Sequence, residues 1–211
     1  MTKMVDIDTN KLDFSKLDFD KLGGLIPACV QDYKSMRLLM VGFMNRDALE
    51  KTLATGLVCF WSRDRKCLWT KGETSGNTLS VKDMVVDCDN DTLLIFAKAA
   101  GPTCHTGAES CFDSDELPAV YWLSKLEKII EGRHKDAPEG SYTVKLFEDG
   151  VKRIAQKVGE EGVETALAAT CGDNEELANE AADLLFHLLV LLRSKNMELS
   201  AVTDVLKDRM K

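Results

Sequence analysis

The apolar residues of this chain change their spacing near the middle, and that change limits the fold more than any other feature. Up to about residue 112, short apolar runs such as LLMVGFM (38–44) and DTLLIFAKA (91–99) are separated by Gly, Asn and Asp, which predicts strands joined by turns. From about residue 120, apolar residues recur three and four positions apart, which predicts amphipathic helices. We therefore expect two domains, a β-rich α+β domain followed by an all-α helical bundle.

The segment between the two patterns is the best candidate for a linker. Residues 113–119 are polar and acidic and contain Pro118, and few contacts should cross such a segment. We therefore expect a first domain at 1–112, a linker at 113–119 and a second domain at 120–211.

Local signals place individual elements within each domain. GLVCFW (56–61) and TLSVKDMVVDC (78–88) predict two more strands, and Arg46–Thr55 predicts a short helix with Asn45 as its N-cap. In the second domain, Asp173 is expected to cap a helix and to form an approximate capping box with the acid three residues later.

Composition excludes several classes of protein. The net charge of −8 argues against nucleic-acid binding, which needs a basic surface. No apolar run approaches the roughly 18 residues that span a bilayer, and residues 1–24 are charged throughout and lack the apolar core of a secretory signal. We expect a cytoplasmic protein with no membrane partner, whose seven cysteines are free thiols or metal ligands because that compartment is reducing.

Three aspartates alternate with other residues between two apolar runs, at Asp87, Asp89 and Asp91. If this segment is extended, the three carboxylates share one face, and they repel one another unless a cation joins them. Oxygen ligands suit Mg²⁺. A calcium loop of the EF-hand type is excluded because Thr92 and Lys98 stand where such a loop needs Gly and Glu. A solvated acidic turn stays open as the alternative.

Two cysteines, Cys104 and Cys111, lie in the segment GPTCHTGAESCF. Thiolates are soft ligands that favour zinc, and Cys88 could supply a third. Three protein ligands leave a fourth position for water, as in catalytic zinc sites, and such a metal lowers the pKa of bound water from about 15.7 towards 7. His105, beside a ligand, could act as a general acid or base. Buried core thiols and a structural histidine are the open alternatives.

The stretch between these motifs, residues 60–77, combines basic and aromatic residues. Arg63, Arg65 and Lys71 are suited to phosphate, and Trp61 and Trp69 offer faces for a purine. The loop at 71–76 could present backbone N–H groups to an anion. A hairpin with charged edges would carry the same residues, and this stretch alone does not decide between the two interpretations.

Four segments together resemble phosphoribosyl-AMP cyclohydrolase over about residues 19–112: LLMVGFMNRDALEKTLATG, WSRDRKCLWTKGETSGN, VDCDND and GPTCHTGAESCF. The resemblance implies hydrolytic opening of an adenine ring and a homodimer with zinc sites where the subunits meet. It implies that Cys88 comes from one chain and Cys104 and Cys111 from the other, with the three aspartates holding Mg²⁺. One departure is Asp64, where the family commonly has a small polar residue; it could weaken phosphate attraction slightly.

The same resemblance assigns roles around the expected zinc. We expect His105 and Glu73 to be catalytic. The expected substrate-binding residues are Trp61, Arg63, Arg65, Trp69, Lys71 and Ser75.

The helical half carries two acidic pairs, Glu161 with Glu164 and Glu180 with Asp183. Glu161 falls in line with the apolar stripe of its helix, and Glu180 lies beside the stripe of the next helix. Acidic side chains are rarely buried without a partner, and facing carboxylates of bundle helices commonly hold metal ions. A charged rim of the bundle is the alternative. For His187, one turn beyond Asp183, we favour a structural role.

This acidic pattern resembles the all-α nucleotide pyrophosphohydrolases. SYTVKLFEDGVKRIAQKVGEEGVE and NEAADLLFHLLVLL narrow the resemblance to phosphoribosyl-ATP pyrophosphohydrolase over about residues 122–211. The resemblance implies that the four carboxylates bind Mg²⁺, which clamps the triphosphate of phosphoribosyl-ATP for cleavage between the α and β phosphates. Glu160 would position the attacking water.

The two resemblances name consecutive steps of histidine biosynthesis, and phosphoribosyl-ATP and phosphoribosyl-AMP are the expected small-molecule partners. A zinc nucleotide deaminase is the first alternative, but the HxE and PCxxC motifs of that class are missing from the sequence. A metal-stabilised scaffold without activity is the second. Metal content together with activity on phosphoribosyl-ATP would separate this scaffold from the expected enzyme.

Overall fold

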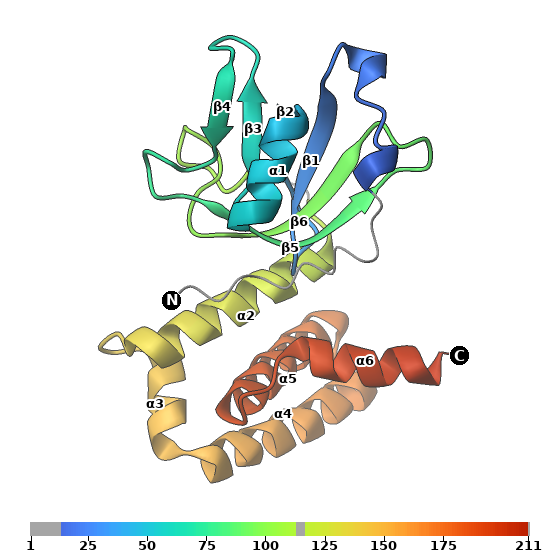
Figure 1. Cartoon of the computed structure of the whole chain (residues 1–211). Helices are drawn as coiled ribbons and strands as arrows, with labels where there is room; N and C mark the ends of the chain where they lie inside the picture. The colour runs from blue at the N-terminus through green and yellow to red at the C-terminus, as the bar shows by residue number, and fades with distance from the viewer. Residues whose placement is uncertain (1–13, 113–116, 211) are drawn as a thin grey trace. The chain divides into compact units, whose positions relative to one another are not determined.

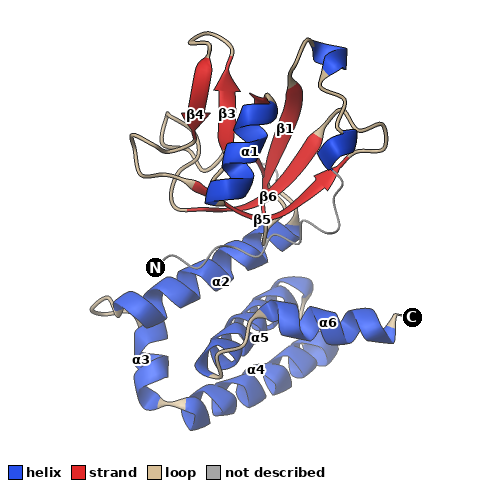
Figure 2. Cartoon of the chain, in the orientation of Figure 1, coloured by secondary structure: helices blue, strands red, loops and turns tan. Residues whose placement is uncertain are grey.

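The computed structural model describes residues 14–112 and 117–210. The chain forms two compact units, Met1–Tyr121 and Trp122–Lys211, and all the strands belong to the first unit (Figure 1). The second unit is helical throughout its described residues, apart from its turns (Figure 2). The predicted fold class is therefore confirmed. Residues 113–116, at the centre of the expected linker, lie outside the described part of the chain.

The first unit is built on a four-stranded mixed sheet. Its strands are β1 (Ile26–Asp32), β2 (Leu38–Met44), β5 (Leu79–Val86) and β6 (Leu93–Ala99). They lie in the order β2-β1-β6-β5, and β1 is antiparallel to β2 but parallel to β6. Buried and half-buried residues alternate along β1, as expected of a strand with one face on a core.

The described part of the first unit also contains a short hairpin, one α-helix and two 3-10 helices, η1 (Phe14–Lys16) and η2 (Asp20–Leu22). The hairpin pairs β3 (Cys59–Ser62) with β4 (Cys67–Thr70), and α1 (Arg46–Thr55) contacts β2, β3 and β4. The core between them includes Ile26, Leu49 and Phe60. Gly42 of β2 lies against the Phe60 ring, where a Cβ would come within 2.3 Å of the ring. A glycine at this position therefore lets the hairpin approach the sheet.

Two of the predicted elements of the first unit are confirmed with their bounds, namely β2 and α1. Asn45 caps α1, since its side-chain oxygen accepts a hydrogen bond of 2.9 Å from the Ala48 N–H. The strands predicted at 56–61, 78–88 and 91–99 exist and are shorter. Apolar patterning does not predict β1, because Pro27 interrupts its apolar run, and it does not decide whether β4 forms.

The described residues of the second unit contain five helices, the first of which begins within the first unit, at Ala119. They are α2 (Ala119–Asp136), α3 (Tyr142–Asp149), α4 (Val151–Cys171), α5 (Asn174–Ser194) and α6 (Leu199–Arg209). The two longest, α4 and α5, pack along each other, and the core includes Ile154 and Val190. Gly150, with a φ of 83°, separates α3 from α4. None of the described helices is long and apolar enough to cross a membrane.

The first turn of α5 is held by the predicted cap. One carboxylate oxygen of Asp173 accepts hydrogen bonds of 2.9 Å from the N–H groups of both Glu175 and Glu176. These N–H groups have no partner within the helix itself. Asp173 therefore fixes where α5 begins, and with it the positions of the acids farther along this helix.

We predict that Asp173→Ala lowers the free energy of unfolding by about 1 kcal/mol, the usual cost of losing a helix N-cap. Chemical denaturation of the full chain would measure it. Asp173→Asn keeps the acceptor oxygen and should cost much less. An equal loss in both variants would mean that charge at the helix end matters more than the cap hydrogen bonds.

Candidate active sites

One pocket of the first unit, of about 420 Å³, gathers seven of the predicted site residues. These are Trp69, Lys71, Glu73, Ser75, Cys104, His105 and Cys111. Residues 69–75 come from the end of β4 and the loop after it, and the other three come from the segment after β6. Two parts of the chain about thirty residues apart thus meet where a thiol pair faces a lysine, a glutamate and a histidine. We call this pocket the cysteine pocket.

A tight loop holds the lysine side of the cysteine pocket. Lys71 is buried, with 7% of its surface exposed, and its ammonium donates a hydrogen bond of 3.1 Å to the Asn77 carbonyl. The Glu73 carboxylate accepts a hydrogen bond of 3.0 Å from the Thr70 N–H, which turns Glu73 back towards β4. Gly72 has a φ of 82°. The loop is thus fixed at both ends and carries one cation into the pocket.

The cysteine side of the pocket is a turn closed by backbone hydrogen bonds. The Cys104 N–H donates to the Ala108 carbonyl at 3.0 Å, and the Cys111 N–H donates to the Leu39 carbonyl of β2 at 2.8 Å. The Thr106 hydroxyl donates to the Cys104 sulfur at 3.2 Å, and His105 Nδ1 lies 3.8 Å from the same sulfur.

The two thiols of the pocket differ in their acidity. Hydrogen bonds from Thr106 hold the pKa of Cys104 below its usual value, whereas burial and the charge of Cys104 raise the pKa of Cys111. Burial also lowers the pKa of Lys71, and the negative charges of Cys111 and Cys104 partly oppose this shift. The pocket therefore holds a thiolate most easily at Cys104, and its lysine is a ready source of compensating charge.

A second pocket of about 570 Å³ adjoins the first, because Trp69 and Met40 line both. Its lining includes Trp61, Arg63 and Arg65. The Arg63 guanidinium lies 3.9 Å from the centre of the Phe43 ring, and that of Arg65 lies 5.9 Å from the centre of a Trp69 ring. Arginines that are steadied by aromatic rings are well prepared to bind phosphate. The predicted base-binding and phosphate-binding residues are thus next to the cysteine pocket.

The three aspartates meet in the turn between β5 and β6. Carboxylate oxygens of Asp87, Asp89 and Asp91 lie within 4.8 Å of one another. The premise that this segment is extended is wrong: it forms a turn in which Asn90 has a φ of 62°. One carboxylate oxygen of Asp87 accepts hydrogen bonds from the N–H groups of Asp91 and Thr92, both at 3.0 Å. The turn itself therefore brings the acids together.

A lysine far away in the sequence lies against this aspartate turn. The Lys21 ammonium is 2.7 Å from a carboxylate oxygen of Asp89 and 2.8 Å from one of Asp91. These hydrogen bonds raise the pKa of Lys21 and lower that of Asp91. Sequence analysis missed Lys21, because nothing near it in the sequence marks it as a partner of the aspartates.

Cys88 lies in the same turn and is exposed. It does not line the cysteine pocket, and among the described residues the three predicted zinc ligands do not form a group within 4.8 Å in one chain. Of the four cysteines outside this set, Cys59 is buried, whereas Cys67 and Cys171 are exposed.

The second unit gathers carboxylates between α4 and α5. Oxygens of Glu161, Glu164 and Glu180 lie within 4.8 Å of one another. Glu161 is buried, with 4% of its surface exposed. Partial desolvation and the charges of Glu161 and Glu180 raise the pKa of Glu164. Asp183 is exposed one turn after Glu180 on α5 and is not part of this group of three.

A cation of the chain lies beside this carboxylate group. The Lys157 ammonium is 2.7 Å from Glu161 and 2.9 Å from Glu160, and these hydrogen bonds raise its pKa. The same contact lowers the pKa of Glu160. Glu160 also accepts a hydrogen bond of 2.7 Å from Gln156. Glu160 is therefore held as a carboxylate at the edge of the group.

His187 connects α5 to α3 beneath the acids. Its Nδ1 lies 2.8 Å from the Asp183 carbonyl, which can only accept, so Nδ1 carries the proton. In the neutral ring, Nε2 then accepts from the Tyr142 hydroxyl at 3.1 Å. Glu161 lies 3.6 Å from Nδ1. His187 is thus a buried residue that contacts the carboxylate group and links α5 to α3.

The lysine loop offers a matched test of backbone geometry. Gly72 and Gly76 have φ values of 82° and 76°, but a Cβ on Gly72 would lie 2.3 Å from the Asn77 backbone, whereas one on Gly76 meets nothing within 4 Å. Gly76→Ala should cost about 1–2 kcal/mol of unfolding free energy, from the left-handed backbone alone. Gly72→Ala should cost clearly more. Equal losses in denaturant unfolding would show that the loop relaxes around the added methyl group.

Comparison with known proteins matches both halves of the chain. Residues 40–113 match the phosphoribosyl-AMP cyclohydrolase family and residues 123–210 match the phosphoribosyl-ATP pyrophosphohydrolase family. Together the two matches take in the cysteine pocket, the aspartate turn and the carboxylate group of α4 and α5.

Whole-length relatives carry the same two parts. The histidine biosynthesis bifunctional protein HisIE of Photobacterium profundum is 53% identical over 194 residues, which cover 90% of this chain and 94% of the relative. The proteins of the same name from Campylobacter jejuni and Escherichia coli are 55% and 54% identical, and each match covers 90% of this chain and 93% of the relative. The chain therefore belongs to the family of bifunctional histidine-biosynthesis hydrolases that join a phosphoribosyl-AMP cyclohydrolase to a phosphoribosyl-ATP pyrophosphohydrolase.

Proposed function

We propose that the first unit opens the adenine ring of phosphoribosyl-AMP between N1 and C6 with the help of zinc. The observation that carries the proposal is the cysteine pocket, in which two thiols of unequal acidity share about 420 Å³ with a histidine, a glutamate and a buried lysine. Thiolates are the ligands that zinc prefers, so this donor set fits zinc. When bound, zinc makes water nucleophilic near neutral pH.

Residues in and beside the cysteine pocket transfer protons and bind the substrate. His105 and Glu73 transfer protons to and from the opening ring, since both line the pocket beside the thiols. Trp61 and Trp69 face the base. Arg63 and Arg65, with Lys71 and Ser75, hold the phosphoribosyl group.

The third zinc ligand, we propose, comes from the second chain of a homodimer. Cys88 is exposed and lies outside the pocket that contains Cys104 and Cys111, so a partner's turn could bring it there. Asp87, Asp89 and Asp91 bind Mg²⁺ near the same junction. Their oxygens are close enough to share one ion, and carboxylate oxygens suit this cation.

The second unit, we propose, cleaves phosphoribosyl-ATP between the α and β phosphates, with Mg²⁺ held by Glu161, Glu164, Glu180 and Asp183. Three of these acids already lie within 4.8 Å of one another, and Asp183 follows one turn later on α5. Glu160, kept ionised by Lys157, positions the attacking water. The product, phosphoribosyl-AMP, is the substrate of the first unit, so the order of the reactions is opposite to the order of the units in the chain.

The remaining proposals concern the chain as a whole. We propose that residues 113–119 link a cyclohydrolase domain at 1–112 to a pyrophosphohydrolase domain at 120–211. The substrates are small molecules, with no nucleic acid or membrane among the partners. The setting is cytoplasmic, where a reducing environment keeps cysteines available as thiols or metal ligands.

We predict that Cys104→Ser and Cys111→Ser each lose tightly bound zinc and ring opening, because a serine hydroxyl is a poor zinc ligand. Pyrophosphate release from phosphoribosyl-ATP should continue in both variants. Cys67→Ser changes an exposed cysteine of the same unit and should leave zinc and both activities intact. A Cys104 or Cys111 variant that purifies with a full complement of zinc would refute this ligand set.

We predict that Asp183→Asn slows pyrophosphate release at least about a hundredfold, which corresponds to roughly 2.7 kcal/mol in the barrier. Loss of one negative ligand weakens Mg²⁺ binding, while lower repulsion among the acids leaves the metal-free fold as stable as before or more so. Ring opening of supplied phosphoribosyl-AMP should be unchanged. Glu175→Gln, in the first turn of the same helix, is the control. Near-normal pyrophosphate release by Asp183→Asn would place this acid on a solvated rim.

A further inference from the structure

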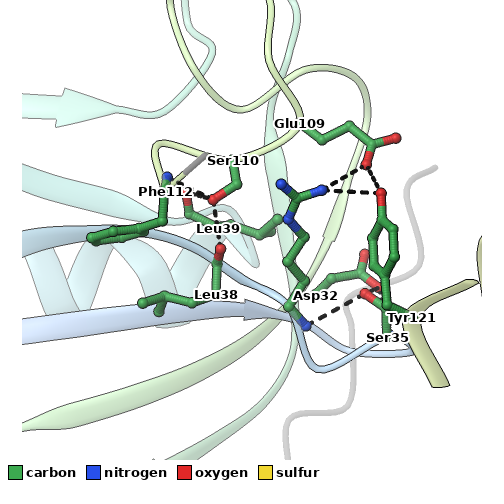
Figure 3. A network of polar contacts seen from close by, with 9 residues as sticks. Asp32, Ser35, Leu38, Leu39, Glu109, Ser110, Phe112 and Tyr121 are labelled. Atoms are coloured by element: carbon green, nitrogen blue, oxygen red, sulfur yellow. Dashed lines mark hydrogen bonds and ion pairs between the residues drawn. The ribbon is translucent and has the colours of Figure 1, made fainter. Parts of the chain in front are cut away.

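The segment that carries Cys111 is bonded to the first two residues of β2. The buried Ser110 hydroxyl donates to the Leu38 carbonyl at 2.6 Å and accepts from the Phe112 N–H at 2.9 Å (Figure 3). The Cys111 N–H donates to the Leu39 carbonyl. These hydrogen bonds fix the backbone on both sides of the cysteine.

A second set of contacts holds the residue just before Ser110. The Tyr121 hydroxyl donates to the Glu109 carboxylate at 2.5 Å (Figure 3). Arg37 Nη1 donates to the same carboxylate oxygen at 3.2 Å and to the Tyr121 oxygen at 3.0 Å. The Arg37 guanidinium also lies 5.0 Å from the centre of the Tyr121 ring. Arg37, Glu109 and Tyr121 thus form a closed triangle, which we call the clasp.

Two of the three side chains of the clasp are nearly buried. Tyr121 is 5% exposed and the Arg37 side chain 12%, whereas the Glu109 side chain is 54% exposed. An ion pair between two exposed side chains contributes little to folding stability. Here the exposed carboxylate accepts hydrogen bonds from two side chains that are nearly buried. Arg37 and Tyr121 both lie outside the segments that match the two enzyme families, at 40–113 and 123–210.

We infer that the clasp positions the Cys111 segment for metal binding, so that the first turn of α2 is part of the ring-opening machinery. This inference rests on the proposed zinc function of the cysteine pocket. Glu109 is two residues from Cys111, and a carboxylate gripped by two donors limits how far that segment moves. Without the clasp, the segment must be ordered each time the metal binds, and the metal leaves faster. Arg37, Glu109 and Tyr121 are positioning residues and do not touch the reacting atoms.

The test uses Tyr121→Phe in the full-length protein. This change keeps the buried ring beneath Arg37 and removes only the hydroxyl. Loss of a hydrogen bond to a charged group should speed transfer of zinc to a chelator about tenfold or more. With Co²⁺ in place of zinc, the thiolate-to-metal absorption should change. Ring opening at limiting zinc should fall, excess zinc should restore it, and pyrophosphate release should not change.

Two further variants make the result decisive. Tyr33→Phe removes a hydroxyl elsewhere in the same unit and should leave zinc transfer as in the unaltered protein. Glu109→Gln keeps the size of the exposed acid and should speed zinc transfer as Tyr121→Phe does, so it serves if Tyr121→Phe folds poorly.

Several outcomes would overturn the inference. A lower melting temperature with unchanged zinc transfer and Co²⁺ absorption would mean that the clasp only stabilises the fold. If Tyr121→Phe and Glu109→Gln behave like the unaltered protein while Cys111→Ser loses zinc, the clasp has no positioning role and the proposed function stands. If Cys111→Ser itself keeps zinc and ring opening, the proposed zinc function is wrong and the inference fails with it.

Discussion

Carboxylate oxygens within 4.8 Å of one another repel unless positive charge is nearby, and each unit of this chain contains a group of three acids that lie this close. In each group a lysine of the chain contacts the acids: Lys21 at the aspartate turn, and Lys157 at α4. The rest of the local structure serves to hold the acids together against this repulsion. In the first unit a turn does so through backbone hydrogen bonds, and in the second two packed helices do so through their shared core.

The site residues of the two units lie on different kinds of structure, helices in the second unit and loops in the first. The acids of α4 and α5 stand on long helices. The Asp173 cap sets the start of α5, and His187 of α5 lies 3.6 Å from Glu161 of α4. The groups of the cysteine pocket lie on loops, so their positions depend on contacts with distant strands and with Tyr121. Precise sites on loops need such support. On our inference the cysteine site, which lies on loops, depends on the clasp for its position, whereas packing of α4 against α5 places the acids of the second unit.

The sequence predicts those features of the fold that depend on residues close together in the chain. The bounds of β2 and α1 and the caps at Asn45 and Asp173 follow from periodicity or capping chemistry, whereas the residues that line the cysteine pocket are expected partly from their chemistry and partly from the family resemblance. It did not predict β1, whose run contains Pro27, or the turn that replaces an extended aspartate segment. The contacts of Arg37 with Glu109 and Tyr121 span 72 and 84 residues. Charged residues are common on surfaces, so no local signal distinguishes those that meet across such distances.

We propose that this one chain carries two hydrolytic sites with different metal requirements. The most direct measurement supplies phosphoribosyl-ATP to the full-length protein after its metals have been removed, and follows pyrophosphate and ring opening together. With Mg²⁺ alone, we expect pyrophosphate to be released and phosphoribosyl-AMP to accumulate, and ring opening to begin only when zinc is added. Ring opening at full rate with Mg²⁺ alone would rule out a zinc-dependent first site, and pyrophosphate release that depends on zinc would rule out a second site that needs only Mg²⁺.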